Sequence, residues 1–324
     1  MRFVIYGVGA IGGVLAAAFA DSGTDVVGIA RGRQLEALKA EKLTMHSPSG
    51  TVSVDIEVVG TPSEVDFGSD DVVLLTLKSQ GTESARRELA AAAGPDLPLV
   101  CVQNGVANER TMARSFRRVY GAVIMMPATF VEPGEVTVYG EPRYGTIDLG
   151  AYPSGGDDTA KAVAAALVAA NFDSRAIPDI MRWKYGKLMG NLTNAIEAVC
   201  GLGTRNGELG RIINAESHSV MAAAGIEFSS EAEEDDRRAG NVELSEVEGI
   251  PRQGASSWQS LARGSGSIES DYLNGEIALL GRMHGVPTPA NDLIQSLANQ
   301  VADSAQPPGA ISEAEVLRRL GSEP

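Results

Sequence analysis

The first thirteen residues constrain the fold of this chain most strongly. A short apolar run at 3–6 continues without a linker into Gly7-x-Gly9-x-x-Gly12, and an alanine-rich apolar segment at 14–20 follows. The apolar run is typical of a buried parallel strand, and the segment after the glycines is typical of a helix. We therefore expect the chain to open with a strand, a glycine turn and a helix, which is the context in which these glycines point to a ligand.

Each glycine of this turn has a separate physical task. Gly7 permits the tight turn after the strand, Gly9 lets the backbone approach a pyrophosphate, and Gly12 lets the helix pack closely against the strand. The N–H groups at the helix start, near Ala10 and Ile11, then face the anion. These five residues are predicted to bind a dinucleotide cofactor.

The end of a second predicted strand, at 25–30, bears on which dinucleotide is bound. NAD-specific folds usually carry an acidic side chain there, which holds the 2′-hydroxyl of the ribose. This chain has Ala30 followed by Arg31 and Arg33, and basic side chains suit a 2′-phosphate. The sequence therefore predicts NADPH/NADP+ as the cofactor, with Arg31 as one of its ligands. The alternative is that both arginines are solvated loop residues.

The composition argues against several other classes of protein. A net charge of −15 does not suit a general nucleic-acid or anionic-membrane surface. No apolar stretch approaches the ~18 residues of a membrane-spanning helix, and glycines interrupt the N-terminal run that would otherwise imitate a secretory signal. Cys101 and Cys200 are too few for a disulfide framework, so we expect buried free thiols and a cytoplasmic protein. The three histidines lack the spacing of metal ligands.

Strands and helices alternate through the first half of the chain. Apolar runs at 71–77 and 97–102 predict buried parallel strands, and the segment at 84–93 predicts a helix between them. This alternation is typical of a doubly wound α/β sheet, which binds ligands beyond the carboxyl ends of its strands. Because Lys78 and Asn104 follow two such ends, we expect them near the nicotinamide or the substrate.

Strand signals almost vanish after Pro178, and amphipathic helices fill the rest of the chain. We therefore expect a Rossmann-like dinucleotide-binding domain at 1–177 and an all-helical domain at 178–324. Three further predictions are a strand at 51–59, antiparallel strands completing the sheet at 119–149, and an acid-rich solvated helix face or mobile connection at 229–248.

A helix predicted at 181–201 carries the second informative pattern. Lys184, Lys187, Asn191 and Asn194 would lie within about 80° of arc at ~3.6 residues per turn, beside a separate apolar face. A solvated polar stripe is the simplest explanation. Asparagine is a poor helix former, however, so two of them in mid-helix call for a reason.

Taken together, these pieces resemble the ketopantoate reductase family. The shared motifs occur in the family's order and cover almost the whole chain. They are Gly7-x-Gly9-x-x-Gly12, Lys78, Gln103-Asn104-Gly105, Trp183 with Lys187-x-x-x-Asn191, and Glu269-x-Asp271-Tyr272-x-Asn274-Gly275. The resemblance implies a Rossmann-like domain followed by an all-α domain, with the site in the cleft between them. It also implies NADPH-dependent reduction of a small 2-oxo acid, 2-dehydropantoate, to pantoate.

The resemblance further implies roles for individual residues. Lys187 would be the general acid, which is efficient if partial burial lowers its pKa from ~10.4 toward neutrality. Glu269 would be a carboxylate that contacts the substrate, and Asn191 would be a substrate ligand. Asn104 would contact both cofactor and substrate, and Lys78 would help to close the nicotinamide site.

Two departures from the family's pattern concern the substrate. The substrate-binding serine of the family falls at Ser257 or Ser256, and the residues after it differ from the usual ones. Family members often carry a second asparagine one turn after the first, where this chain has Ala195 beside Asn194. Asn194 and Ser257 are therefore candidate substrate ligands, and the choice between the two serines stays open.

Two other functions share part of the pattern. A 3-hydroxyacid dehydrogenase has the glycine motif and a Lys-x-x-x-Asn helix, but would not be expected to carry Gln-Asn-Gly or Asp-Tyr-x-Asn-Gly. A non-catalytic NADPH-binding sensor is the third candidate, because fold does not determine function. The presence of both Lys187 and Glu269 speaks against the sensor. The sequence leaves open which 2-oxo acid is reduced and whether the chain forms a homodimer.

Overall fold

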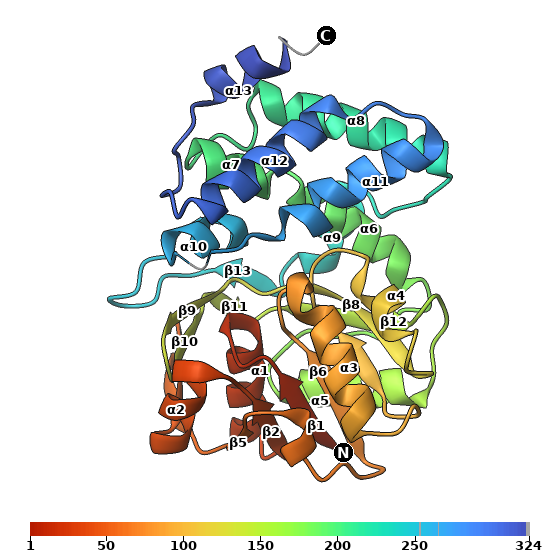
Figure 1. Cartoon of the computed structure of the whole chain (residues 1–324). Helices are drawn as coiled ribbons and strands as arrows, with labels where there is room; N and C mark the ends of the chain where they lie inside the picture. Colours follow the sequence, from red (N-terminus) through yellow and green to blue (C-terminus); the bar gives the residue numbers. More distant parts are fainter. Residues whose placement is uncertain (253, 265, 322–324) are drawn as a thin grey trace. The chain divides into compact units, whose positions relative to one another are not determined.

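The computed structural model describes residues 1–252, 254–264 and 266–321. The chain divides into two compact units. Unit 1 comprises Met1–Lys184 and Ala232–Arg252, and unit 2 comprises Tyr185–Glu231 and Gln253–Pro324. Each unit has its own architecture (Figure 1). Unit 1 is built on strands, whereas the named elements of unit 2 are helical among the described residues.

A seven-stranded sheet forms the centre of unit 1, in the order β12-β8-β7-β6-β1-β2-β5. All neighbouring pairs are parallel except β12 and β8, which are antiparallel. The order reverses between β1 and β6, which is the point where a doubly wound sheet binds its ligand. The strands are β1 (Arg2–Tyr6), β2 (Val26–Ile29), β5 (Glu57–Val59), β6 (Asp71–Leu75), β7 (Leu99–Cys101), β8 (Val119–Met125) and β12 (Thr146–Ala151).

Helices cover both faces of this sheet (Figure 1). Side chains alternate along β1, so that Phe3 and Ile5 join the core under one layer of helices, while Val4 and Tyr6 join the core under the other. The first layer contains α1 (Ala10–Asp21) and α5 (Asp158–Ala169), and the second contains α3 (Thr82–Ala92) and α4 (Asn108–Met112). Phe3 stacks on Phe19 of α1 with 4.3 Å between the ring centroids. The predicted doubly wound fold is therefore confirmed.

A second sheet differs from the sequence-based expectation. It has the order β4-β3-β10-β9. The predicted strand at 51–59 is in fact two strands in different sheets, β4 and β5, because the chain turns between Val54 and Glu57. The segment 119–149 contributes β8 and β12 to the main sheet as expected, but β9 and β10 to the second sheet. The strands are β3 (Leu43–Ser47), β4 (Gly50–Val54), β9 (Ala128–Glu132) and β10 (Glu135–Val138), with a separate pair β11 (Gly140–Pro142) and β13 (Val242–Leu244).

The acid-rich segment is anchored in unit 1 rather than simply solvated. Helix α9 (Glu231–Arg238) carries Arg237 in its last turn, and this side chain is buried. Its guanidinium donates to both carboxylate oxygens of Asp148 on β12, each at 2.6 Å, and also pairs with Asp173. Composition alone pointed to a solvated or mobile segment because the acids dominate it, whereas one buried arginine fixes its position.

Unit 2 is a group of packed helices. Its buried side chains include Leu192, Ile196, Ile213 and Ile294. Glu216 of α8 accepts hydrogen bonds from the backbone N–H groups of Ala290 and Asn291, which satisfies the start of α12. The helices are α7 (Asn194–Cys200), α8 (Glu208–Ala224), α10 (Ser256–Ala262), α11 (Asn274–His284), α12 (Pro289–Asp303) and α13 (Glu313–Leu320), with α6 (Ile180–Asn191) leading into them.

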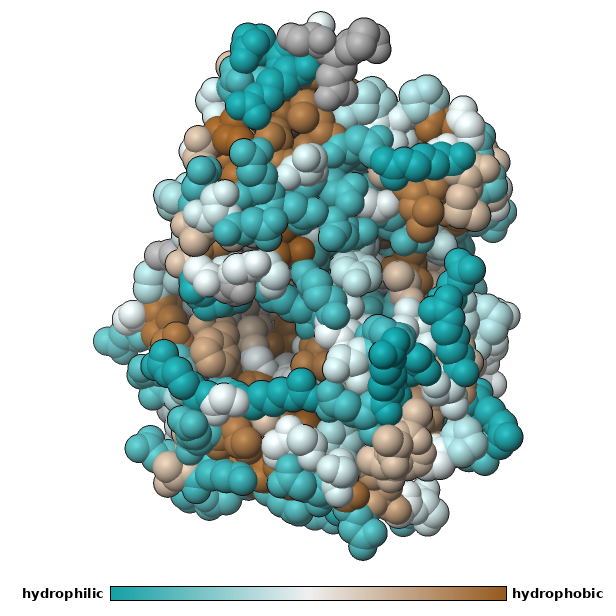
Figure 2. All heavy atoms as spheres, viewed as in Figure 1, coloured by the Kyte–Doolittle hydropathy of each residue, from teal (hydrophilic) through white to brown (hydrophobic). Residues whose placement is uncertain are grey.

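The surface carries hydrophobic side chains in separate patches on the face shown in Figure 2. Across the described residues, no helix combines the length and the apolar character needed to cross a membrane. Both cysteines are free, as expected. Cys101 is buried, as expected, but Cys200 is only partly buried, so the expectation of a buried thiol was wrong for Cys200.

Candidate active site

The glycine turn between β1 and α1 has the geometry that the motif requires. Gly7 has a φ of +109°, a conformation that strains any residue with a side chain. A Cβ at Gly12 would lie 2.1 Å from the Gly7 carbonyl oxygen and 2.6 Å from the Thr76 hydroxyl oxygen. These two glycines are therefore required by the fold of the chain itself.

Gly9 is different, and this difference is informative about a ligand. A Cβ at Gly9 would meet no protein atom within 4 Å, and its φ of −95° is accessible to other residues. Gly9 is also the N-cap of α1, which has no side-chain cap and no acidic residue in its first turn. Open space in front of uncapped N–H groups fits the pyrophosphate of a dinucleotide. Ala10 and Ile11 lie in this first turn.

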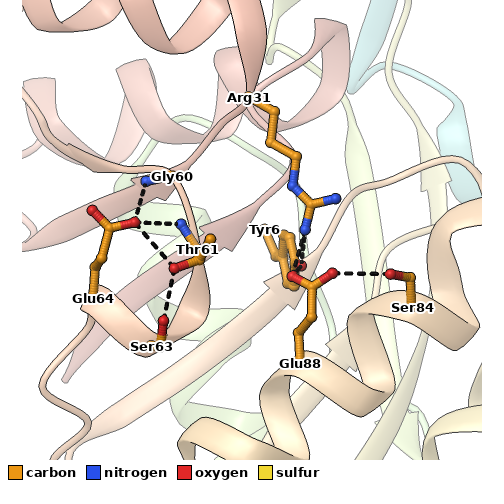
Figure 3. A network of polar contacts seen from close by, with 8 residues as sticks. All are labelled: Tyr6, Arg31, Gly60, Thr61, Ser63, Glu64, Ser84 and Glu88. Atoms are coloured by element: carbon orange, nitrogen blue, oxygen red, sulfur yellow. Dashed lines mark hydrogen bonds and ion pairs between the residues drawn. The ribbon is translucent and has the colours of Figure 1, made fainter.

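Arg31 lies just beyond the carboxyl end of β2, at the N-cap of α2 (Gly32–Ala40). Figure 3 shows its guanidinium beside Glu88 of α3 and the hydroxyl of Tyr6. The carboxyl end of β2 is not followed by an acidic residue in the sequence, yet the fold brings one there from 57 positions away. Arg31 is therefore at the position predicted for a ligand of the ribose phosphate, but it already has a carboxylate partner.

Lys78 and Asn104 follow the carboxyl ends of β6 and β7, as expected. Lys78 is the N-cap of a short 3-10 turn, η2 (Ser79–Gly81), and is partly buried. Asn104 is partly buried, and its carbonyl accepts a hydrogen bond of 3.0 Å from Asn108. Asn108 in turn contacts Ser79, so one buried amide links the two strand ends. The turns that carry both candidate residues are thus tied together within unit 1.

A buried ion pair supports the turn that carries Asn104. Lys184 Nζ lies 2.6 Å from Glu109 Oε1, and the two side chains are 2% and 0% exposed. The ammonium also donates to the carbonyl oxygens of Gln103 at 2.9 Å and Ala122 at 3.2 Å. Three acceptors therefore satisfy the three donors of Lys184. Burial raises the pKa of Glu109, and the charge of Lys184 opposes that shift.

Lys184 therefore does not belong to a solvated stripe. The helix face that the sequence spacing predicts to be polar and solvated contains Lys184, which is buried against Glu109. Glu109 lies in α4 and was not singled out by sequence reasoning, because nothing in the local pattern marks it as buried. The glycine at 121 makes room for the pair, since a Cβ there would lie 3.1 Å from Lys184 Cδ and 3.3 Å from Glu109 Oε1.

The single helix predicted at 181–201 is two helices. α6 ends at Asn191 and α7 begins at Asn194. The break leaves the Leu192 carbonyl without a helical partner, and Asn274 Nδ2 donates to it at 3.1 Å. Asn194 thus starts a new helix instead of continuing the stripe. Two poor helix formers flank a real interruption, and a third asparagine from a distant helix stabilises it.

The remaining candidate residues lie in unit 2. Lys187 is partly buried on α6, while Asn191 is 6% exposed and Asn194 is 5% exposed. Ser257 is buried at 4% exposure, whereas Ser256 is exposed. The helix that begins at Ser256 is held by Glu197 of α7, which accepts from the Ala255 N–H at 3.0 Å. The helices that carry Asn194 and Ser257 therefore lie side by side.

Glu269 starts the short turn η3 (Glu269–Tyr272) and is partly buried. The motif after it has a structural task. Asp271 accepts hydrogen bonds from two side chains of α12, and a Cβ at Gly275 would lie 2.8 Å from the amide nitrogen of Gln295. Asn274 is fully buried between Leu192 and Asn291. These contacts position the turn that carries Glu269.

A doubly wound parallel sheet with a glycine cradle at its reversal point defines a dinucleotide-binding protein of the Rossmann class. The family model described as ketopantoate reductase PanE/ApbA matches residues 3–154, and its C-terminal counterpart matches residues 179–302. The chain belongs to the ketopantoate reductase family. It is therefore an oxidoreductase, a reductase of this family.

Individual proteins support the same assignment. A 2-dehydropantoate 2-reductase of Archaeoglobus fulgidus is 30% identical over 312 residues, covering 93% of this chain and 97% of the relative. The structure of a PanE/ApbA family ketopantoate reductase from Ralstonia eutropha has a TM-score of 0.79 at 27% identity, covering 94% and 99% of the two chains. The ternary structure of D-mandelate dehydrogenase with NADH and anilino(oxo)acetate has a TM-score of 0.80 at 24% identity over 94% and 99%, which shows a shared fold.

Proposed function

We propose that this chain uses NADPH to reduce the 2-oxo group of 2-dehydropantoate, giving (R)-pantoate. The observation that carries the proposal is the match to 2-dehydropantoate 2-reductases along nearly the whole chain, of which the Archaeoglobus fulgidus protein is 30% identical. The open space in front of Gly9 and the uncapped start of α1 support a dinucleotide as the cofactor.

In this proposal the cofactor-binding residues come from unit 1. Gly7, Gly9 and Gly12 shape the cradle, while Ala10 and Ile11 lie in the helix turn that meets the pyrophosphate. Arg31 faces the ribose 2′-phosphate. Lys78 and Asn104 lie at the strand ends that border the nicotinamide. When bound, NADPH supplies the hydride that reduces the carbonyl carbon.

The proton and the substrate contacts come from the helical part of the chain. Reduction places negative charge on the carbonyl oxygen, so a positioned acid must deliver a proton there. We assign this role to Lys187. Glu269, Asn191, Asn194 and Ser257 are assigned to the substrate. We propose a cofactor domain at 1–177 and a substrate domain at 178–324, although residues 178–184 and 232–252 group with the first of the two compact units.

The test follows NADPH absorbance with 2-dehydropantoate and a panel of other 2-oxo acids. We expect Lys187→Ala to lower turnover by a factor of about 100 or more, because a general acid contributes roughly that much, while NADPH still binds. Lys161→Ala is the matched control. This lysine is 71% exposed on α5, where it pairs with Asp158, so its loss should leave turnover unchanged.

Four outcomes would contradict the proposal. Wild-type turnover in the Lys187→Ala variant would remove this residue from the mechanism. Activity only on 3-hydroxy acids with NAD would indicate the dehydrogenase alternative. Binding of NADPH without turnover of any acid would indicate a sensor. Activity confined to a different 2-oxo acid would retain the reaction and replace the substrate.

A further inference from the structure

A cluster of four side chains lies at the carboxyl ends of β1 and β2 (Figure 3). We call Tyr6, Arg31, Ser84 and Glu88 the ribose cluster. Glu88 is its centre. Its Oε2 accepts from the Tyr6 hydroxyl at 2.6 Å and from the Arg31 guanidinium, and its Oε1 accepts from the Ser84 hydroxyl at 2.9 Å. Arg31 also donates to the Tyr6 hydroxyl oxygen at 3.0 Å.

Within this cluster Glu88 is held more firmly than Arg31. Tyr6 is 2% exposed, so its hydroxyl has a constant position, and Ser84 lies one turn from Glu88 on α3. Two donors therefore hold the carboxylate independently of Arg31. The Arg31 side chain is 57% exposed, whereas that of Glu88 is 30% exposed. Arg31 can leave Glu88 at small cost, because exposed ion pairs are weak.

The carboxylate of Glu64, which Figure 3 also shows, already accepts hydrogen bonds from its own turn. It accepts from the backbone N–H groups of Gly60 and Thr61 and from the Thr61 hydroxyl, and so caps the turn η1 (Pro62–Glu64) (Figure 3). Of the two, Glu88 is the one paired with Arg31. Glu88 therefore brings a carboxylate to the end of β2, where NAD-binding folds usually carry an acid, although it comes from α3.

We propose that Glu88 sets the preference between NADPH and NADH, by competing with the 2′-phosphate for Arg31 and by accepting the 2′-hydroxyl when the phosphate is absent. This inference rests on the proposed function, which brings a dinucleotide to this end of the sheet. A phosphate must draw Arg31 away from Glu88 and then lies near a carboxylate of like charge. A ribose hydroxyl needs only the acceptor that Tyr6 and Ser84 already hold in place.

The ionisation of Glu88 agrees with this role. Burial raises the pKa of Glu88, but hydrogen bonds from Tyr6, Arg31 and Ser84 outweigh it and hold the pKa below its usual range. The carboxylate is therefore charged at neutral pH, and the charges of Arg31 and Glu88 cancel. A ribose site without net charge does not strongly favour the phosphorylated cofactor. We expect the wild-type protein to bind both dinucleotides.

The experiment measures Kd for NADPH and NADH by nicotinamide fluorescence on the full chain. The quantity of interest is the ratio of the NADH value to the NADPH value. Glu88→Gln should raise this ratio about tenfold, because it removes a charge repelling the phosphate and weakens the acceptor for the hydroxyl. Arg31→Ala should lower the ratio by a similar factor. Tyr6→Phe, which frees the carboxylate but keeps its charge, should change the ratio less than Glu88→Gln.

Glu83→Gln is the matched control. Glu83 lies on the same helix and carries the same charge, but it pairs with Arg86 and Arg87 instead of Arg31. Its loss should leave the ratio unchanged. An equal change of the Kd ratio in Glu83→Gln and Glu88→Gln would show that only the net charge of the protein matters, and it would overturn the inference. If the Glu88→Gln variant still binds NADPH and its Kd ratio stays within twofold of the wild-type ratio, the inference about Glu88 is overturned. The proposed function would still stand in that case. A wild-type chain that binds neither dinucleotide would overturn both.

Discussion

Two ion pairs of unit 1 join a basic to an acidic side chain but lie in opposite surroundings. Arg31 and Glu88 are 57% and 30% exposed, at the rim of the sheet. Lys184 and Glu109 are 2% and 0% exposed, beneath the turn that carries Asn104. Water screens the first pair and is excluded from the second. The exposed ion pair and the buried ion pair therefore have different roles, although both join a basic and an acidic side chain.

The exposed pair is exchangeable, since a ligand phosphate can take the place of a carboxylate at the rim. The buried pair is not, because an ion that loses its partner in the interior stays desolvated. Lys184 also holds the Gln103 carbonyl, one residue before Asn104. We infer that the buried pair positions the backbone of the site, while the exposed pair selects what binds there.

The largest effect is expected from breaking the buried pair. Lys184→Met should lower the free energy of unfolding by about 3–5 kcal/mol, because it leaves Glu109 buried without a partner. The further change Glu109→Met should restore part of this loss, since it removes the lone charge, but the carbonyls of Gln103 and Ala122 stay unpaired. Urea unfolding of the single variant and of the double variant measures these free energies. A single variant as stable as wild type would show that the pair is dispensable.

The Lys184→Met variant should also depend on pH in a defined direction. Burial raises the pKa of Glu109 in the folded protein, and without Lys184 the main opposition to that rise is lost. A carboxyl whose folded pKa exceeds its unfolded value of ~4.3 binds its proton more tightly when folded, so stability is greatest at low pH and falls as pH rises toward the folded pKa. The loss relative to wild type should be smaller at pH 5 than at pH 8. An equal loss at both values would contradict this account.

A smaller effect is expected from crowding the same pair. Gly121→Ala would place a Cβ 3.1 Å from Lys184 Cδ and 3.4 Å from the Met181 sulfur. Overpacking of this kind costs about 1–3 kcal/mol. Gly94→Ala is the control, because a Cβ there meets nothing within 4 Å. Thermal unfolding compares the two, and equal changes would show that the space around the pair is not limiting.

The smallest effect on stability is expected at the exposed pair. Glu88→Gln should change the free energy of unfolding by less than about 1 kcal/mol, the usual range for exposed ion pairs. The same variant should shift the preference between the two dinucleotides, so stability and binding respond separately. A loss of stability as large as that of Lys184→Met would show that both pairs are structural and would remove the contrast between them.

Local signals in the sequence predicted much of the frame. The apolar run before Gly7, the turn itself and the helix after it were recognisable because each depends on neighbours in the chain. The same holds for the strands that precede Lys78 and Asn104. The helix at 181–201 was predicted as one element, and its interruption was missed. Its stabilising partner, Asn274, is 82 residues from Leu192 and no local pattern connects them.

The sequence by itself determined the doubly wound sheet and the glycine cradle, because strand burial, a tight turn and helix packing are set by residues a few positions apart. Only the tertiary structure decided that Glu88 would meet Arg31 and that Lys184 would be buried against Glu109. These partners are 57 and 75 positions apart. The identity of a charged residue does not show whether its side chain lies in water or in a core, because only folding determines its environment.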